Sequence, residues 1–348
     1  MKNDLKGISE FLDFYNTDST GKNYQSAISN YLKEIYPEYN KIPAGNEFKT
    51  IQKSIGKSKP KTSKSRLLDT LNSMSIQYLK EIRKGRDFKT DLTMVNNVFI
   101  RKYAPNTSRK YIQIVIIWLE FNGINVSFWD KKRIFAKSPA ARPISDEMDT
   151  EKELWREVCD NLPQKYKAVI LCLLGSGMRT GECMKLKKSD IDFSSTPVKI
   201  YLKQSYTKGK IPRMCMLSGE AVTELKKYLD SRADNDERVF PFAPYTLAYH
   251  WRRTIDGLGY GEKDPNTGIR LLHIHMTRKW FLSQFPLAAS KDIGEMLAGH
   301  MGYLSGSYRR YSHKLVAKEF LKAENTISIY NETPVYTNQQ ELTIQIKA

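Results

Sequence analysis

Apolar residues recur at helical spacing through the opening segment, residues 6–39, and predict two helices there. Ser19 or Thr20 stands where it can cap the second helix. The apolar positions that define the pair are Leu12, Phe14 and Tyr15 in the first helix and Tyr24, Ile28, Tyr31 and Leu32 in the second. The pattern therefore predicts that the chain starts with helices rather than with a sheet.

The same periodicity returns in residues 67–85 and 106–124, and the second of these repeats the cap-then-helix order of the opening. Residues 135–150 contain two prolines and few apolar residues, without periodicity, which is typical of a linker. We therefore expect an all-helical domain over residues 1–134 and a linker over 135–150.

The pattern changes after the linker. Residues 152–177 read as two helices and residues 219–232 as another, whereas residues 198–207 alternate between apolar and polar positions. The alternation places Val198, Ile200 and Leu202 on one face of a strand and Lys199, Tyr201 and Lys203 on the other. A second short run at residues 212–217 follows a "KGK" turn, which predicts a hairpin.

These elements predict a fold that is mainly α with a small antiparallel β-sheet, the second domain spanning residues 151–330. The tail that follows, residues 331–348, ends in an alternating run that can form one more strand. Such a tail could be exchanged between protomers of an assembly, whereas a disordered end is the simpler interpretation.

Composition limits the class of protein. With 27% charged and 40% hydrophobic residues over 348 positions, the chain has neither the composition of a disordered protein nor that of a membrane protein. The longest apolar run, near residues 166–175, is far shorter than a bilayer crossing, and no signal-peptide pattern opens the chain. The four cysteines form no CxxC pair, which favours reduced thiols. These features predict a cytoplasmic protein.

Net charge is the first functional clue. A formal charge of +18 favours a polyanionic partner, through phosphate contacts and counterion release. Residues 51–66 contain six basic residues and no acidic one, which indicates a solvated loop or a DNA-facing arm. The side chains of this arm that we expect to contact DNA are Lys57, Lys59, Lys61, Lys64 and Arg66.

Several short motifs in the second domain carry candidate chemistry. Arg179 follows two glycines at a predicted turn, and Glu182 stands three residues later, where it can orient the guanidinium. His275 and Arg278 are one helical turn apart, and Lys208 lies at the hairpin tip. The glycines do not form a phosphate-binding loop, because neither GxxxxGK[ST] nor GxGxxG fits them. Each motif alone also suits an ordinary surface or structural residue, so their order along the chain carries the information.

That order is Arg-x-x-Glu, Lys, His-x-x-Arg, Gly-His and Tyr, and it resembles the catalytic set of the tyrosine recombinases, the phage integrase family. "LLGSGMRTGECMKLKKSDID" is similar to the family's first arginine box, "HIHMTRKWF" to its second, and "EMLAGHMGYLSGSYRRYS" to its terminal box. The likeness extends over roughly residues 8–328 and is nearest to the archaeal integrase type.

The resemblance implies a fold, an activity and partners. An all-helical core-binding (SAM-like) domain and an α+β catalytic domain would close around duplex DNA as a clamp. The enzyme would cleave and rejoin attachment sites through a 3′-phosphotyrosine intermediate, as a homotetramer on paired sites and without a cofactor or metal. It would integrate or excise a virus, plasmid or other mobile element.

The resemblance also assigns roles that suit the residue types. Arg179 and Arg278 would bind the non-bridging phosphate oxygens, because a guanidinium fork stays charged and binds two oxygens at once. Lys208 would protonate the leaving 5′-oxygen, and His275 would act as acid or base near neutral pH. His300 would hydrogen-bond a phosphate oxygen or position the tyrosine.

The nucleophile is expected among the tyrosines of the terminal box. Arg309 occupies the family's usual tyrosine position, Tyr308 lies one residue before it and Tyr311 two residues after it. We favour Tyr308 and keep Tyr311 as the alternative nucleophile, since Tyr311 also fits the core face of the following helix with Leu315. Arg309 and Arg310 would contact the DNA backbone or remain solvated.

Periodicity leaves both tyrosines open, because Tyr308, Val316 and Phe320 also share a helical stripe. A further departure from the family is Thr277, where many members have leucine before the second arginine. This exchange touches no proposed catalytic atom.

Other functions compete with this interpretation. A type IB topoisomerase-like enzyme would use similar groups, and a catalytically inactive regulator would keep the DNA-binding charge alone. Four of the five histidines lie within residues 273–313, but no carboxylate or cysteine stands at metal-ligand spacing near them. Residues 261–268 resemble a calcium loop only faintly and indicate a turn.

Overall fold

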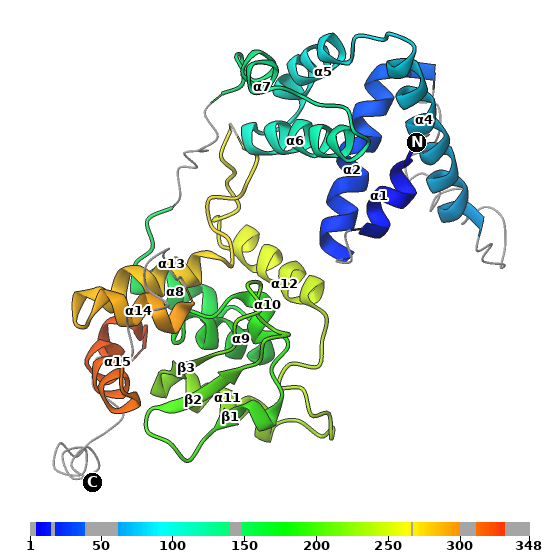
Figure 1. The fold of residues 1–348 in the computed structure, drawn as a ribbon. Coiled ribbons are helices and arrows are strands. Elements are labelled where there is room, and N and C mark those ends of the chain that lie inside the picture. The colour runs from blue at the N-terminus through cyan, green and yellow to red at the C-terminus, as the bar shows by residue number, and fades with distance from the viewer. Residues whose placement is uncertain are drawn as a thin grey trace. The chain divides into compact units, whose positions relative to one another are not determined.

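A computed structural model describes residues 5–14, 18–38, 62–139, 148–265, 267–299 and 311–330 of the chain (Figure 1). The chain divides into two compact units. The first comprises Met1–Ser145 with Pro265–Gly268, and the second comprises Asp146–Asp264 with Ile269–Ala348. The main point of division falls within residues 135–150, while the roles of the two units as DNA-gripping and catalytic domains stay predictions.

The first unit is helical throughout its described residues. Its helices are α1 (Ile8–Phe14), α2 (Asp18–Ile35), α4 (Thr62–Arg83), α5 (Phe88–Lys102), α6 (Pro105–Phe121) and α7 (Phe128–Ile134). Helix α6 packs against α2 and α5, and α1 packs against α4. The helices predicted near residues 6–39, 67–85 and 106–124 are confirmed, whereas α5 and α7 are not among the predicted elements.

Polar caps explain where these two additional helices begin. Asp87 accepts hydrogen bonds from the backbone N–H groups of Lys89 and Thr90, at 3.1 and 3.3 Å, ahead of α5. Ser127 and Asp130 form a reciprocal capping box at the start of α7. Such caps stabilise short helices because the first N–H groups of a helix have no partner within it.

One predicted cap is wrong. Helix α2 begins at Asp18, so Ser19 and Thr20 lie in its first turn, and neither is the residue that precedes the helix. Capping preference places a helix start only to within about two residues, because neighbouring positions can also adopt helical torsions.

The basic segment also differs from its prediction. Helix α4 begins at Thr62, so Lys64 and Arg66 belong to a helix rather than to a loop or arm, and their side chains lie outside the described part. The rest of that segment, residues 51–61, falls outside the described residues. A basic stretch does not by itself exclude helix, because lysine and arginine are good helix formers.

Apolar periodicity does locate the core of this unit. Its fully buried members include Ile28, Tyr31 and Leu32 from α2 and Ile112, Val115, Trp118 and Leu119 from α6. These residues lie on facing helices, so the stripe that predicts each helix is also the surface that joins them.

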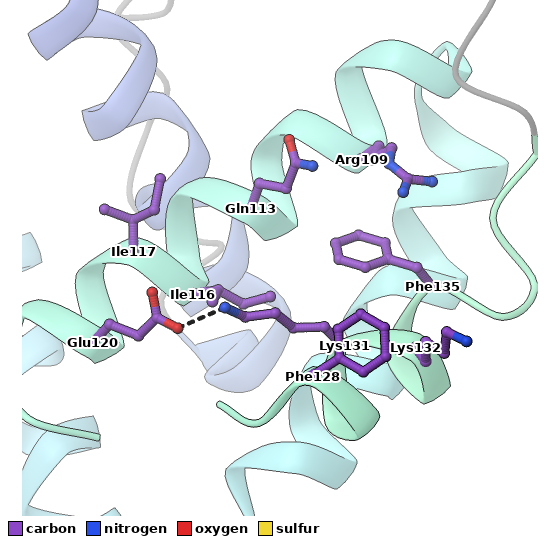
Figure 2. A pocket seen from close by; sticks show the side chains of 9 residues that line it. All are labelled: Arg109, Gln113, Ile116, Ile117, Glu120, Phe128, Lys131, Lys132 and Phe135. Carbon is purple, nitrogen blue, oxygen red and sulfur yellow. Dashed lines mark hydrogen bonds and ion pairs between the residues drawn. The ribbon is translucent and has the colours of Figure 1, made fainter. Parts of the chain in front are cut away.

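A groove of the first unit lies beside α6 and α7 (Figure 2). Its lining residues are Arg109, Gln113, Ile116, Ile117, Glu120, Phe128, Lys131, Lys132 and Phe135. The Lys131 ammonium lies 2.7 Å from a Glu120 carboxylate oxygen, and the Arg109 guanidinium lies 4.9 Å from the centre of the Phe135 ring. The groove thus combines apolar and basic side chains.

The second unit combines a small sheet with helices (Figure 1). Its α-helices are α8 (Lys152–Asp160), α9 (Gln164–Leu174), α10 (Thr180–Cys183), α11 (Gly219–Asp230), α12 (Pro244–Gly257), α13 (Met276–Gln284), α14 (Lys291–Ala298) and α15 (His313–Ile327). Two 3₁₀ turns, η2 (Lys188–Asp190) and η3 (Phe285–Leu287), complete the described helical elements. The chain is therefore mainly α with a small antiparallel β-sheet, as its sequence predicts.

The sheet has the order β1 (Ile191–Asp192), β2 (Val198–Leu202) and β3 (Arg213–Leu217), with both pairs antiparallel. Residue Ile200 pairs with Cys215, and Leu202 pairs with Arg213. The predicted hairpin and its buried face are confirmed, since Val198, Ile200 and Leu202 are buried. The predicted bounds are wrong, because the first strand ends at Leu202 rather than at residue 207 and the connection is residues 203–212 rather than a short turn. Strand β1 has only two residues, too few for an alternating pattern to reveal.

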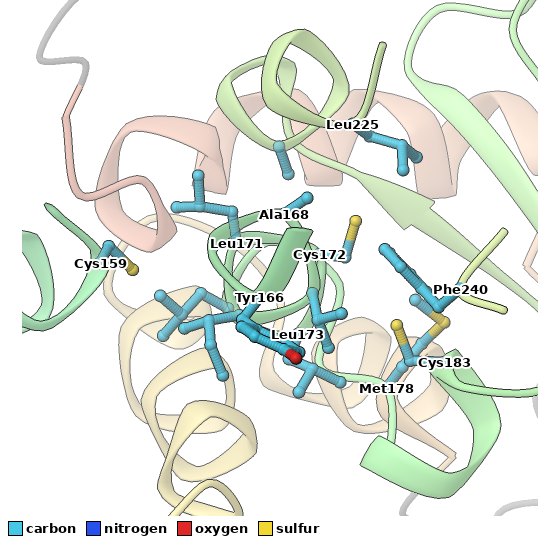
Figure 3. Close-up of a cluster of buried hydrophobic side chains, with 14 of the residues drawn as sticks. Cys159, Tyr166, Ala168, Leu171, Cys172, Leu173, Met178, Cys183, Leu225 and Phe240 are labelled. Atoms are coloured by element: carbon cyan, nitrogen blue, oxygen red, sulfur yellow. The ribbon is translucent and has the colours of Figure 1, made fainter. Parts of the chain in front are cut away.

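The core of the second unit forms around α9, whose buried side chains pack against α11 (Figure 3). Four cysteines, Cys159, Cys172, Cys183 and Cys215, are buried there as free thiols. Burial raises the pKa of each, to about 12 for Cys215, so these thiols stay protonated and act as small apolar side chains.

A second cluster joins α13, α14 and α15. Helix α15 begins after Ser312, whose hydroxyl accepts a hydrogen bond from the Leu315 N–H at 3.2 Å. Val316 and Phe320 lie on its buried face, where the Phe320 ring contacts that of Phe285. The cluster includes Leu297 and Ala298, so it packs against the C-terminal end of α14.

Candidate active site

The turn between α9 and α10 brings two motifs of the sequence together. Gly177 has a φ of +65°, a conformation that glycine adopts without strain. A Cβ at this position would lie 2.5 Å from the Phe281 ring of α13. The chain can therefore pass close to α13, and this contact sets Arg179, two residues after Gly177, beside Arg278 on α13.

Arg179 and Glu182 are linked twice across α10. The Arg179 backbone N–H donates to one carboxylate oxygen of Glu182 at 2.9 Å, and its Nη1 donates to the other at 3.1 Å. Glu182 is only 1% exposed, whereas the Arg179 side chain is 32% exposed. The carboxylate therefore fixes one edge of the guanidinium and leaves part of the group open to solvent.

Arg213, the first residue of β3, shares the same carboxylate. Its Nη1 and Nη2 donate to the two oxygens of Glu182 at 2.9 and 2.6 Å. Burial alone would raise the pKa of Glu182, but the hydrogen bonds from Arg213 and from the Arg179 backbone hold that pKa below its ordinary value. Glu182 is thus a buried anion bridging two arginines.

The C-terminal end of α14 is held by three arginines. Arg213 Nε donates to the Leu297 carbonyl at 3.2 Å, Arg278 Nη1 donates to the Ala298 carbonyl, and Arg179 Nη2 donates to the Gly299 carbonyl at 3.3 Å. The last carbonyls of a helix lack partners within it and carry partial negative charge, so cations are favoured there. Three consecutive carbonyls therefore receive one guanidinium each.

Arg278 is the most buried arginine of this group, with 4% of its surface exposed. Its Nη1 also donates to the Gly177 carbonyl at 2.7 Å, but its Nη2 is buried and has no hydrogen-bond partner among the described residues. Burial and then the positive charges of Arg179 and Arg213 lower the pKa of Arg278 to about 10. One guanidinium nitrogen is therefore left able to bind a further acceptor.

The cluster carries a surplus of positive charge in its described part. Three guanidinium groups lie near the carboxylate of Glu182, which forms ion pairs with two of them, Arg179 and Arg213. Buried charges are expected to have partners, and an unpaired one is costly. An anion bound beside Arg278 would supply the missing negative charge.

His275 directly precedes α13 and is exposed. Its pKa is lowered, first by loss of hydration and then by the nearby positive charges of Arg278, Lys279 and Arg179 and by His273. The lowered pKa favours a neutral ring at pH 7, which can accept as well as donate a proton. The cluster thus acts on His275 electrostatically.

Lys208 lies on the connection between β2 and β3 and is exposed. Within the described residues, no hydrogen bond or ion pair joins it to Arg179, Glu182 or Arg278. The sequence thus predicts its place in the hairpin correctly, while its role as a proton donor stays a prediction.

Tyr311 precedes α15 and is half-buried against the cluster formed by α13, α14 and α15. The expected core face shared with Leu315 is wrong, because Leu315 is 40% exposed. Residues 311 and 312 are not helical, so α15 begins at His313. The predicted helical stripe of Tyr308 with Val316 and Phe320 includes Tyr308, which lies outside the described residues.

The remaining predicted site residues lie outside the described part of the chain. They are His300, Tyr308, Arg309 and Arg310 in the candidate site and Lys57, Lys59 and Lys61 in the basic segment. The last described residue before the first group is Gly299, whose carbonyl Arg179 binds.

Sequence reasoning misses Arg213. It stands 31 residues from Glu182, and nothing local in "IPRMCML" marks it as an ion-pair partner. The only signal is indirect: a carboxylate buried beside an arginine has room for several donors, and the hairpin supplies a cation at its base.

The described residues contain neither a candidate metal site nor a helix that could cross a membrane. No group of three or more histidine, cysteine or acidic side chains there is placed to hold a metal ion. The helices drawn for the same residues are all too short or too polar to cross a bilayer.

The part of the chain that is similar to known sequences includes the arginine cluster. Residues 147–301 match the model of the phage integrase family. The chain is 29% identical over 138 residues to tyrosine recombinase XerA of Pyrococcus horikoshii, a match that covers 40% of this chain and 45% of that relative. The chain thus matches less than half the length of this curated relative.

The chain is also similar to solved structures of recombinases. A lambda integrase(75-356) dimer bound to a COC′ core site is similar with a TM-score of 0.49 and 14% identity, covering 77% of this chain and 96% of that one. The XerA recombinase structure has a TM-score of 0.38 and 16% identity, covering 93% and 98%. XerH bound to palindromic difH has a TM-score of 0.46 and 17% identity, covering 63% and 67%.

Proposed function

Because this chain belongs to the phage integrase family through residues 147–301, we propose that the protein is a site-specific tyrosine recombinase. It would cleave and rejoin duplex DNA at attachment sites through a 3′-phosphotyrosine intermediate. Its biological role would be to integrate or excise a mobile element, viral or plasmid, acting inside the cell as a homotetramer on paired sites.

A single observation carries the proposal. Arg278 is buried with Nη2 unpaired in the described structure, beside Arg179 and a carboxylate already shared by two arginines. Such a site lacks one anion, and a phosphodiester offers two non-bridging oxygens to guanidinium groups. Charge fixed in advance where a phosphoryl transition state needs it is a major source of catalysis in such reactions.

The reaction can be written with these residues in roles. The phenol oxygen of Tyr308 forms a bond to phosphorus while the bond from phosphorus to the 5′-oxygen breaks. The phenol proton passes to an acceptor, for which neutral His275 is suited, and the leaving oxygen takes a proton from Lys208. Arg179 and Arg278 bind the non-bridging oxygens throughout. The reverse sequence reseals the strand, so no external energy source is needed.

Tyr308 is preferred to Tyr311 because Tyr311 is half-buried against the α13–α15 cluster. A nucleophile must reach phosphorus, and a ring engaged in packing would have to leave its contacts first. Tyr311 is therefore assigned to packing.

The first test is covalent capture. The protein is incubated with a library of nicked duplexes of randomised sequence, in which cleavage releases a short strand and traps the adduct. We expect a protein–DNA adduct whose linked peptide contains Tyr308. Tyr308→Phe should abolish the adduct, whereas Tyr311→Phe, the matched control, should keep it within about threefold of wild type.

Other outcomes are equally informative. A linked peptide containing Tyr311 would reassign the nucleophile. Efficient relaxation of supercoiled plasmid of arbitrary sequence would favour the topoisomerase-like alternative. DNA binding without any adduct would indicate a regulator and contradict the proposed enzyme.

A further inference from the structure

Arg213 differs from the other two arginines in how its nitrogens are used. Nε, Nη1 and Nη2 each donate a hydrogen bond, the first to the Leu297 carbonyl and the other two to Glu182. Its side chain is 13% exposed, against 32% for Arg179. Every guanidinium nitrogen of Arg213 therefore has a partner, whereas Nη2 of Arg278 has none among the described residues. Arg213 is poorly suited to bind a phosphate directly.

Its position joins three parts of the candidate site. As the first residue of β3, Arg213 pairs with Leu202 at the base of the hairpin that carries Lys208. Its side chain reaches Glu182, which orients Arg179, and the end of α14, which leads to His300. One side chain thus ties the hairpin, the first arginine motif and the last helix before the terminal box.

The packing around this link is tight. A Cβ on Gly299 would lie 2.6 Å from Arg213 Nε, and Gly299 adopts a φ of +69°. Glycine is therefore required where the chain turns away from α14 beneath the guanidinium. Any movement of Arg213 would shift this turn, since the two groups leave no space between them.

The geometry points to Arg213 as a positioning residue for the proposed reaction. It holds Glu182 and the Leu297 carbonyl of α14 in fixed positions, so that Arg179 and Arg278 are directed toward one phosphate. We call the hydrogen bonds from Arg213 to Glu182 and to the Leu297 carbonyl the clamp. The inference rests on the proposed recombinase function, although the clamp itself is a property of the fold.

Lysine cannot reproduce this link. A guanidinium is a planar fork that binds both carboxylate oxygens and still offers Nε to a third acceptor, whereas an ammonium is a single point of charge. Arg213→Lys keeps the charge and should lose the geometry. A small misplacement of catalytic groups can reduce a rate by about a hundredfold.

Arg232→Lys is the matched control in the same unit. The Arg232 side chain is 5% exposed, pairs with Asp234 through Nε and Nη2, and donates through Nη1 to the carbonyls of Arg238 and Val239. It is a structural arginine as fully engaged as Arg213 but without a bond to Glu182 or α14. Its replacement measures the general cost of losing a guanidinium fork.

The test has two readouts on the full-length protein. The first is the single-turnover rate of adduct formation on the nicked duplex library, with the fraction of DNA bound measured alongside. We expect Arg213→Lys to reduce the rate about a hundredfold at unchanged DNA binding, and Arg232→Lys to stay within about threefold of wild type. Equal rates for Arg213→Lys and wild type would overturn the inference.

The second readout is hydrogen exchange of the peptide covering α14, which needs no activity. We expect faster exchange at the end of α14 in Arg213→Lys and unchanged exchange there in Arg232→Lys. If wild type forms no adduct, the proposed function fails, and faster exchange would still support the clamp. Unchanged exchange in Arg213→Lys would refute the clamp whatever the activity.

Discussion

The two units of the molecule each contain a network of arginines and carboxylates, and the two networks are balanced in opposite ways. In the first unit, Arg86 lies between two carboxylates, with Nη1 2.5 Å from Glu81 and Nε 2.7 Å from Asp91. In the second unit, the carboxylate of Glu182 serves Arg179 and Arg213.

The pKa values follow this balance. The pKa of Arg86 is raised, chiefly by its hydrogen bond to Asp91, with Glu81 contributing in the same direction. The pKa of Arg278, which lies beside the Glu182 cluster, is lowered to about 10 by burial and by two neighbouring arginines. The network of Arg86 has two carboxylates for one arginine and is saturated with negative charge. The cluster around Glu182 has more arginines than carboxylates.

The difference is the one expected between a structural ion pair and the proposed phosphate site. Arg86 also lies over the rings of Tyr36 and Tyr78, at 5.6 and 5.3 Å, and Tyr78 donates to Asp91. The guanidinium of Arg86 and its two carboxylates are therefore paired with one another within the fold. The cluster of the second unit leaves Arg278 Nη2 unpaired in the described structure. A buried donor without a partner is costly to keep, and a ligand that pairs with it explains why it persists.

The largest expected effect comes from removing the unpaired group. Arg278→Gln should lower the rate of adduct formation by about a thousandfold, because a preorganised charge on the transferring phosphate is lost. Arg86→Gln is the matched change in the saturated network and should leave the rate within about threefold. Single-turnover capture on nicked duplexes measures both, and circular dichroism confirms that each variant is folded.

Comparable losses in the two variants would break the comparison. A large loss in Arg86→Gln would mean that the first unit's network takes part in the reaction. A small loss in Arg278→Gln would remove the main support for a phosphate site.

The next effect is on stability and is expected from changing the carboxylates. Glu182→Gln leaves Arg179 and Arg213 without a negative partner in a buried site and should reduce the free energy of unfolding by about 3–5 kcal/mol. Asp91→Asn should reduce it by about 1 kcal/mol, because Arg86 keeps Glu81 and the pair is partly exposed. Urea denaturation gives both values, and a larger loss for Asp91→Asn would contradict the contrast.

Glu182→Gln should also change how the stability of the protein depends on pH. Because the pKa of Glu182 is lowered in the folded state, its stabilising effect is complete above its unfolded pKa and is lost as the pH falls through the folded one. Wild type should therefore lose this contribution in acid. Glu182→Gln has already lost it and should show a flatter dependence there.

Prediction from sequence succeeds where the information is local. The apolar stripes of α2 and α6, and the alternation of β2, each lie within one element and locate both the element and its buried face. Polar caps at Asp87 and Ser127 mark the starts of α5 and α7. Helix α5 also buries Leu92, Val95 and Phe99 at helical spacing, so its sequence carries a local signal that the prediction missed.

The same distinction between local and long-range information applies to the candidate site. Arg179 and Glu182 are neighbours in sequence, so their pairing can be foreseen from spacing alone. The link from Glu182 to Arg213 spans 31 residues, and the bond from Arg278 to Gly177 spans 101. Contacts at such separations depend on how α9, β3, α13 and α14 pack together, and the local sequence of an arginine does not encode them.

The smallest expected effect sharpens the comparison directly, because it asks which network binds an anion. Sulfate resembles a phosphodiester in shape and charge, and at about tenfold above its dissociation constant it would stabilise the folded state by about 1.4 kcal/mol. We expect sodium sulfate to raise the melting temperature of wild type beyond the rise seen with sodium chloride at equal ionic strength. Arg278→Gln should lose this excess, since the unpaired nitrogen is gone. Arg86→Gln should keep it in full while melting at a lower temperature, because its network is neutralised within the fold and offers sulfate no vacant donor. An excess that survives in Arg278→Gln and disappears in Arg86→Gln would place the anion site in the first unit and reverse the assignment of the two networks.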